Sequence, residues 1–144
     1  SKKIGIIYQD KNLLPDFTTL ENVYMARLSL DNNKKKAVLD AKNIIKKVGL
    51  DKRLSHYPSE LSGGESQRVA ISRALINSPD IILADEPTGN LDQKNAKEIF
   101  KLLLSLKNKK RIIIFATHNR HFANMSDCKL SLIDGKIISI NARS

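Results

Sequence analysis

The sequence is poor in the residues that mark several protein classes. Its 144 residues include one cysteine, no tryptophan, six glycines and four prolines, and aromatic residues make up only 5%. A single cysteine, Cys128, excludes an internal disulfide and a cysteine-based zinc site. The few aromatic side chains offer little for stacking on single-stranded nucleic acid. No hydrophobic run approaches the roughly 18 residues of a membrane-spanning helix, and we expect no signal peptide.

The composition is that of one globular domain with a basic surface. Hydrophobic residues make up 41% and charged residues 28%, which suffices for one core but not for two ordinary domains. Lys and Arg number 25 against 15 Asp and Glu, so the net charge is +10. Such a surplus is typical of proteins that bind nucleic acid, anionic lipid or acidic partners. Because most of the excess is lysine in short runs, we interpret it as a solvated surface and expect no nucleic-acid partner.

Three apolar runs predict strands. They cover 4–8, 81–84 and 111–116, and the last two are continuous, as in buried parallel strands. Near the C-terminus, Asp134-Gly135 between two apolar runs predicts a hairpin.

Helices are predicted between these strands. The capping pattern Thr18 to Glu21 and apolar residues at helical spacing predict helices over 20–28, 34–48 and 65–77. Strands that alternate with helices indicate an α/β fold with a parallel sheet. The region between residues 20 and 54 contains no predicted strand, so we expect an all-helical insertion beside that sheet.

Polar side chains follow two of the predicted strands. Asp85 and Glu86 end one strand, and His118 ends the next. Ligands of open α/β sheets bind outside the carboxyl ends of the strands. An aspartate there suits the shell of a Mg²⁺ ion on a phosphate chain, and a glutamate can polarise an attacking water. Each feature alone is equally typical of a turn, a helix cap or an ordinary loop histidine.

A second polar segment, Ser62-Gly63-Gly64-Glu65, precedes a predicted helix. A hydroxyl, two glycines and a helix N-terminus together can cradle a phosphate. The same residues also form a capping box, with Ser62 as the cap and Glu65 as its partner. The two interpretations are compatible.

Taken together, these segments resemble the ABC-type ATPase domains of the P-loop NTPases. The order and spacing match in five places: a Q-loop at Gln9, a signature motif at 61–65, a Walker B strand at 81–87, a D-loop at 89–92 and an H-switch at His118. The signature and the Walker B strand, about twenty residues apart, are the most specific pair. Segments such as 12–15 and 87–92 resemble the branch that serves lipoprotein-release and macrolide-export membrane partners, or the related cell-division ATPase.

The resemblance implies a role for each strand-end residue. Asp85 would hold the Mg²⁺ shell, and Glu86 would be the general base. His118 would contact the γ-phosphate of ATP. Gln9 would sense Mg²⁺ and the attacking water, and would link the site to the membrane partner.

The resemblance also implies partners. Two ATPase domains would sandwich two ATP molecules head to tail, so that Ser62, Gly63 and Gly64 reach the ATP bound by the opposite subunit and Asp92 crosses the interface. The helical subdomain, residues 20–60, would press on a transmembrane permease subunit. Residues 61–144 would hold the signature helix and the Walker B and H-switch part of the core. The protein would then lie on the cytoplasmic face of the cell membrane.

One element of the family pattern is missing from the sequence. No G-x-x-x-x-G-K-[ST] motif occurs, and the only Gly-Lys pair, Gly135-Lys136, runs into Ile137. The chain therefore resembles the C-terminal two-thirds of such a domain. Because the P-loop lysine and amides are the main grip on the β- and γ-phosphates, we expect the isolated chain to be inactive. We also expect it to self-associate through an apolar strand left at a sheet edge, which we assign to 81–84.

Two other functions stay open at this stage. A DNA-repair or chromosome-structure ATPase shares the signature and Walker B, but usually carries long coiled coils between the Q-loop and the signature. Here the interval is about fifty residues without sustained heptads. A non-catalytic interaction module is the second alternative, and the absent P-loop favours it.

Overall fold

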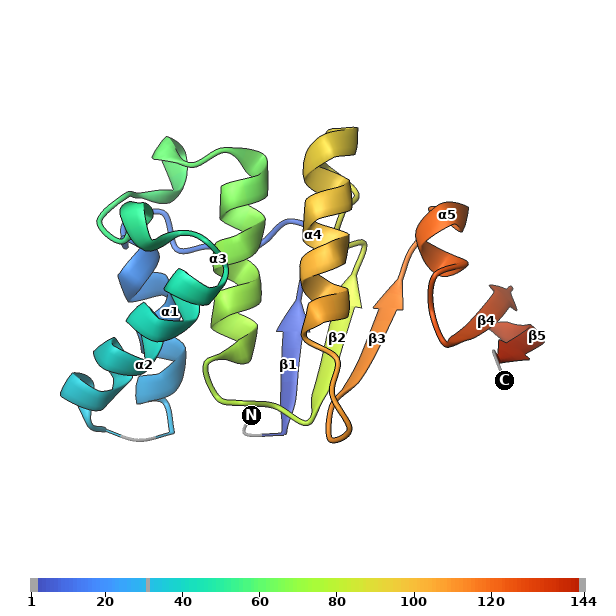
Figure 1. The fold of residues 1–144 in the computed structure, drawn as a ribbon, viewed down its shortest axis with the longest axis horizontal. Helices are drawn as coiled ribbons and strands as arrows, with labels where there is room; N and C mark the ends of the chain where they lie inside the picture. Colours follow the sequence, from blue (N-terminus) through green and yellow to red (C-terminus); the bar gives the residue numbers. More distant parts are fainter. Residues whose placement is uncertain (1–2, 31, 143–144) are drawn as a thin grey trace.

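The computed structural model describes residues 3–30 and 32–142. Its centre is a three-stranded parallel sheet in the order β1-β2-β3. The strands are β1 (Ile4–Ile7), β2 (Ile81–Asp85) and β3 (Ile112–Ala116). Two helices, α3 (Gly63–Leu75) and α4 (Gln93–Ser105), lie on one face of this sheet (Figure 1). The α/β architecture with a parallel sheet is thus as predicted.

The helices begin and end close to their predicted limits because their caps are local. Asp92 caps α4 by accepting from the N–H groups of Lys94 and Asn95. The apolar face of α4 is buried against the sheet and α5 (Arg120–Ala123), and it consists of Ala96, Ile99, Phe100 and Leu103.

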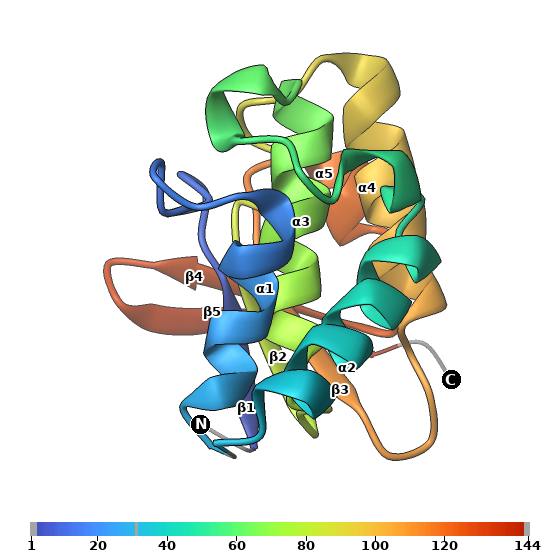
Figure 2. The same cartoon turned by 90° about the vertical axis from the view of Figure 1, so that its left-hand side faces the viewer.

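The stretch between β1 and α3 is helical among the residues described. It contains α1 (Thr19–Leu28), α2 (Lys34–Lys47) and the short 3₁₀ turns η1 (Asp51–Arg53) and η2 (Pro58–Glu60). Figure 2 shows α1 and α2 in front of α3. The apolar residues of these two helices share a core with Val69 of α3 and with Ile76, which directly follows α3. These two short helices fill the interval in which a coiled coil would stand in a DNA-associated ATPase. A Gly at position 49, with φ of +79°, ends α2 in the left-handed conformation that glycine adopts most readily.

The structure corrects two predictions about the sheet: helices cover only one of its faces, and the strand at 81–84 does not lie at its edge. In β2, Ile82 and Ala84 are buried while Ile81 and Leu83 are half-buried, and in β3 Ile112 and Ile114 are 60% and 55% exposed. The runs 81–84 and 111–116 are therefore not buried on both faces. The strand at 81–84 is also not an edge strand: β2 lies in the middle, and β1 and β3 form the edges.

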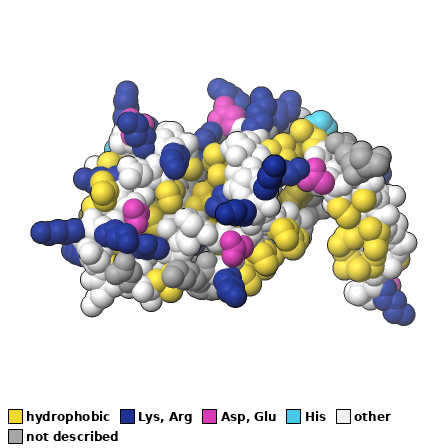
Figure 3. Space-filling model, turned by 60° about the horizontal axis from the view of Figure 1, so that its bottom comes forward, with side chains coloured by type: hydrophobic (Ala, Val, Ile, Leu, Met, Phe, Trp, Pro, Cys, Tyr) yellow, Lys and Arg dark blue, Asp and Glu magenta, His cyan; other side chains and the backbone are white. Residues whose placement is uncertain are grey.

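A hairpin of β4 (Cys128–Ile133) and β5 (Lys136–Ala142) projects from the body (Figure 1). Its turn is Asp134-Gly135, and both residues have positive φ, as the tight turn requires. The two strands pack mainly on each other. Hydrophobic side chains therefore cover much of the hairpin surface at the right of Figure 3, and further ones lie on the body beside it.

No helix among residues 3–30 and 32–142 combines the length and the apolar character needed to cross a bilayer.

Candidate functional site

The parallel register brings the predicted strand-end residues to one edge of the sheet. Ile7 pairs with Ala84, and Asp85 pairs with Ala116, so all three strands end within a residue or two of one another. The N–H of Glu86 then donates to the carbonyl of Ala116 at 3.0 Å and extends the ladder by one step. Gln9, Asp85, Glu86 and His118 consequently follow adjacent strand ends.

Glu86 lies at the centre of this group. Its carboxylate accepts from the backbone N–H of His118 at 2.7 Å, contacts the His118 Nδ1 at 2.7 Å and accepts from the Thr117 hydroxyl at 3.1 Å. The Glu86 side chain is 18% exposed, whereas the His118 ring is 83% exposed. The backbone of Glu86 has φ of +40°, a left-handed conformation that a residue with a side chain rarely adopts. This turn aims the carboxylate back toward the end of β3.

Asp85 and Gln9 lie on either side of Glu86 in different surroundings: Asp85 is exposed, whereas Gln9 packs against the D-loop. The Asp85 side chain is exposed and makes no hydrogen bond or ion pair with the rest of the described chain. Gln9 lies against the D-loop, because a Cβ added to Gly89 would meet Gln9 Nε2 at 3.2 Å and Glu86 Cβ at 3.3 Å. Gln9 and Glu86 therefore both border Gly89.

An open cavity of about 420 Å³ adjoins the strand ends. Its walls include Glu86 and His118, with Gly89 from the D-loop, Lys97 from α4 and Phe122 from α5. The Phe122 ring stacks on Phe100 of α4 at a centroid distance of 4.4 Å, which fixes α5 beside the cavity. The cavity thus combines a carboxylate, an imidazole and an ammonium group on packed elements.

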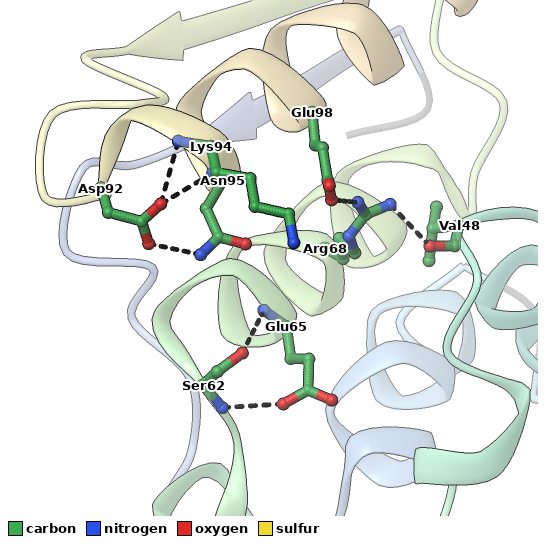
Figure 4. A network of polar contacts seen from close by, with 8 residues as sticks. All are labelled: Val48, Ser62, Glu65, Arg68, Asp92, Lys94, Asn95 and Glu98. Atoms are coloured by element: carbon green, nitrogen blue, oxygen red, sulfur yellow. Dashed lines mark hydrogen bonds and ion pairs between the residues drawn. The ribbon is translucent and has the colours of Figure 1, made fainter.

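The signature segment begins α3. Ser62 accepts from the N–H of Glu65 at 3.2 Å, and Glu65 accepts from the N–H of Ser62 at 2.8 Å, so the predicted capping box is present (Figure 4). Arg53 of η1 also donates to Glu65 at 2.8 Å. The Ser62 N–H first, and Arg53 second, lower the pKa of Glu65 from 4.5 to about 2. The signature helix therefore starts with a fixed negative charge joined to the helical region.

Gly63 and Gly64 lie against the start of α4. An added Cβ would meet Leu91 Cδ2 at 3.3 Å from position 63, and Asn95 Oδ1 at 2.5 Å from position 64. Only glycine allows the close approach at position 64. The signature segment and Asp92 are thus neighbours within one chain, and α3 and α4 begin at the end of the molecule toward which the strands point (Figure 1).

The eight predicted site residues therefore form two groups at one end of the fold. One group follows the strand ends, and the other begins the helices α3 and α4.

Three further residues near the site escaped prediction from the sequence: Thr117, Arg73 and Asn95. Thr117 donates to Glu86, and Arg73 of α3 donates to the carbonyls of Lys11 and Asn12, both at 2.6 Å, in the loop after Gln9. No local pattern signals Arg73, since its partners lie about sixty residues away. Thr117 directly precedes His118, and Asn95 lies three residues after Asp92, so their positions beside recognised motifs could have signalled a role.

A protein-family model matches the N-terminal part of the chain. The family model described as ABC transporter matches residues 1–89, which include the signature and Walker B segments. This chain belongs to the ABC transporter family. Among its relatives are lipoprotein-releasing system ATP-binding proteins from Rickettsia bellii, 50% identical over 135 residues, and from Cytophaga hutchinsonii, 47% identical over 139 residues.

Those matches cover 93% and 96% of the chain but only 61% and 64% of the two relatives, so the chain spans about three fifths of their length. A solved ATP-binding cassette, a dimer in a post-hydrolysis state bound to ADP and Pi, aligns with a TM-score of 0.84 at 34% identity. The alignment covers 97% of this chain and 62% of that one. The ABC cassette fold extends over the described chain.

Proposed function

We propose that these residues form the larger part of an ATP-hydrolysing subunit that drives a membrane transporter. The observation that carries this proposal is the convergence of Gln9, Glu86 and Gly89 beside His118, in a chain of the ABC transporter family. The relatives are ATP-binding proteins of a lipoprotein-releasing system, and we infer a transport role of the same kind.

In this proposal, the strand-end group carries the chemistry. Glu86 accepts a proton from the water that attacks the γ-phosphate, and His118 donates a hydrogen bond to that phosphate. The bonds of the Glu86 carboxylate to Thr117 and His118 hold it in place. Oε1 contacts both His118 nitrogens and Oε2 accepts only from Thr117, so Oε2 keeps an acceptor position for the water.

The Asp85 side chain fits a magnesium site. Mg²⁺ in phosphate-binding sites is held by one or two carboxylates, with phosphate oxygens and water as the other ligands. Asp85 offers an exposed carboxylate with no protein partner among the described residues, and the Gln9 amide lies beside Gly89, near the residue that follows Asp85. Bound there, the ion would neutralise phosphate charge.

The helix-start group faces a second copy in this proposal. Ser62, Gly63 and Gly64 contact the ATP of the opposite subunit, and Asp92 crosses the interface. Support comes from the exposed positions of Ser62, Gly63 and Asp92 at the same end of the molecule as the strand ends, and from the dimeric form of the solved neighbours. Residues 20–60 act as a helical subdomain against a transmembrane permease, and the protein lies on the cytoplasmic face of the membrane.

The experiment measures ATP hydrolysis by the full gene product that carries these residues, in wild-type form and with Glu86→Gln. We expect the substitution to lower kcat by about a hundredfold or more, because the general base is lost. Glu98→Gln is the matched control, since it removes a glutamate on α4 that pairs with Arg68. Unchanged hydrolysis in Glu86→Gln would overturn the proposed role of Glu86.

The 144-residue chain is assayed beside it. Because the sequence contains no P-loop motif, we expect no turnover from this chain alone. Turnover that Glu86→Gln abolishes would contradict that expectation.

A further inference from the structure

The side chain of Asn95 lies between the D-loop residue Asp92 and the signature residue Gly64. Asn95 lies in the first turn of α4, and its side-chain nitrogen donates to Asp92 Oδ2 at 2.5 Å. The backbone N–H of Asn95 donates to Asp92 Oδ1 at 3.0 Å (Figure 4). Two of the three hydrogen bonds that hold the Asp92 carboxylate therefore come from Asn95, and the third comes from the N–H of Lys94.

The other end of the Asn95 amide lies on Gly64. A Cβ at position 64 would lie 2.5 Å from Asn95 Oδ1 and 2.9 Å from its Cγ. Such distances are impossible for a real side chain, so an alanine at 64 has to push the Asn95 amide away. The absence of a side chain at Gly64 is thus what allows Asn95 to reach Asp92. Gly63 differs, because a Cβ there meets only the flexible end of Leu91, at 3.3 Å.

We propose that Asn95 is a positioning residue that clamps the signature segment to the D-loop, so that the exposed residues Ser62, Gly63 and Asp92 present one rigid surface to the partner subunit's nucleotide. This inference rests on the proposed function for its consequence, but the clamp itself is a property of the single chain. The proposal also gives Gly64 a second role, because the Asn95 amide occupies the space that a side chain at position 64 would fill.

The first experiment follows the Asp92 carboxylate in the full gene product by NMR titration. The N–H of Asn95 first, and its side-chain amide second, hold the pKa of Asp92 below its ordinary value. We expect Asn95→Ala to raise this pKa toward the ordinary value. Gly64→Ala should raise it equally through displacement of the amide, and the double variant should match the single ones. Gly63→Ala is the control and should leave it unchanged.

Two results overturn the clamp. One is a Gly64→Ala chain in which Asp92 keeps its wild-type pKa, and the other is a double variant in which the two increases add. If Gly64→Ala does not fold, the reverse measurement decides. Asp92→Ala should shift the backbone amide resonance of Gly64 in the wild-type background but not in Asn95→Ala, and equal shifts in both overturn the proposal.

The second experiment uses ATP hydrolysis by the full gene product. We expect Asn95→Ala to lower kcat roughly tenfold, because misplaced groups lose the aligned geometry. An unchanged kcat, in an enzyme that Glu86→Gln inactivates, overturns the functional part of this inference while the proposed function stands. Absence of hydrolysis in the wild-type product overturns the proposed function, while the titration still decides whether the clamp exists.

Discussion

A single buried amide organises the loop between the Q-loop residue and the helical region. Asn22 of α1 is 2% exposed, and its side-chain oxygen accepts from the N–H of Leu14 at 2.8 Å. Its nitrogen donates to the carbonyls of Leu14, Phe17 and Thr18. One side chain therefore satisfies four backbone groups of a segment that has no regular structure of its own.

We expect Asn22→Ala to lower the free energy of unfolding by about 2–3 kcal/mol, because buried backbone groups lose their partners. Urea unfolding followed by circular dichroism measures this. Asn43→Ala changes an exposed asparagine of α2 and should alter the free energy by less than about 0.5 kcal/mol. Equal effects of the two substitutions would show that the Asn22 network contributes no stability.

At this scale, the sequence predicts residues whose partners are close in the chain. Thr18 and Ser62 were recognised as caps because their partners lie three residues away. Asn22 serves backbone groups 4 to 8 residues away, and Arg73 serves carbonyls 61 and 62 residues away, so the side chain alone does not indicate which carbonyl it will meet. The carboxyl-end cluster was predictable because parallel strands bring their ends together.

The start of α3 joins three segments. Ser62 and Glu65 cap each other, and Glu65 also binds Arg53 of η1. Arg68, one turn further on, donates to the carbonyl of Val48 at 3.0 Å and to Glu98 of α4 at 2.9 Å (Figure 4). One helix thus connects the helical region to the helices on the sheet through charged side chains.

The low pKa of Glu65 predicts a pH-dependent contribution to stability. With a folded pKa of about 2 against an ordinary 4.5, the charged form favours folding above pH 4.5, and the benefit is lost as the pH falls toward 2. We expect Glu65→Gln to lower the free energy of unfolding at pH 7 by about 1 kcal/mol. The difference from wild type should shrink between pH 5 and 2.

Thermal unfolding across that pH range measures the effect. Because the Ser62 N–H is the larger cause, Arg53→Met should keep most of the pH dependence. A constant gap between wild type and Glu65→Gln from pH 7 to pH 2 would refute the assignment.

Helix positions were predictable within about two residues because glycine and capping residues mark their ends. The predicted helix over 65–77 begins at Gly63 and ends at Leu75. The prediction started the helix after the two glycines, and the structure includes them because a cap at Ser62 leaves both in the first turn. The element order and the helical stretch between β1 and α3 were likewise predictable from periodicity.

Over the whole molecule, a broad apolar surface remains uncovered. It comprises the open face of the sheet, with Ile6, Ile112 and Ile114, and the projecting hairpin, with Leu132 and Ile140 (Figure 3). A surface of this extent exceeds the scattered apolar residues that a monomer usually exposes.

We expect the 144-residue chain to self-associate through this surface. The double substitution Ile112→Lys/Ile114→Lys on β3 should shift light scattering toward the monomer, because charged groups at an edge strand oppose pairing. Leu39→Lys/Asn43→Lys places the same added charge on exposed positions of α2 and should leave association unchanged. A wild-type chain that scatters as a monomer would contradict the expectation.

The open sheet face also marks the limit of prediction from sequence. The apolar run 81–84 has the same letters whether helices cover one face of a strand or both, so burial on both sides was the natural but wrong inference. The strand order could not be predicted either, because the sequence of 81–84 does not indicate which strands pair with it. Only the packing shows that β2 lies between β1 and β3.

The left-handed backbone of Glu86 has an evolutionary consequence. A non-glycine residue held at φ of +40° costs on the order of 1 kcal/mol, and replacement by glycine would release that cost. The same replacement would remove the contacts of the carboxylate with Thr117 and His118, whose contribution is of similar size. A laboratory selection for heat resistance would therefore gain little at this position, and thermostable descendants must gain their stability elsewhere in the fold.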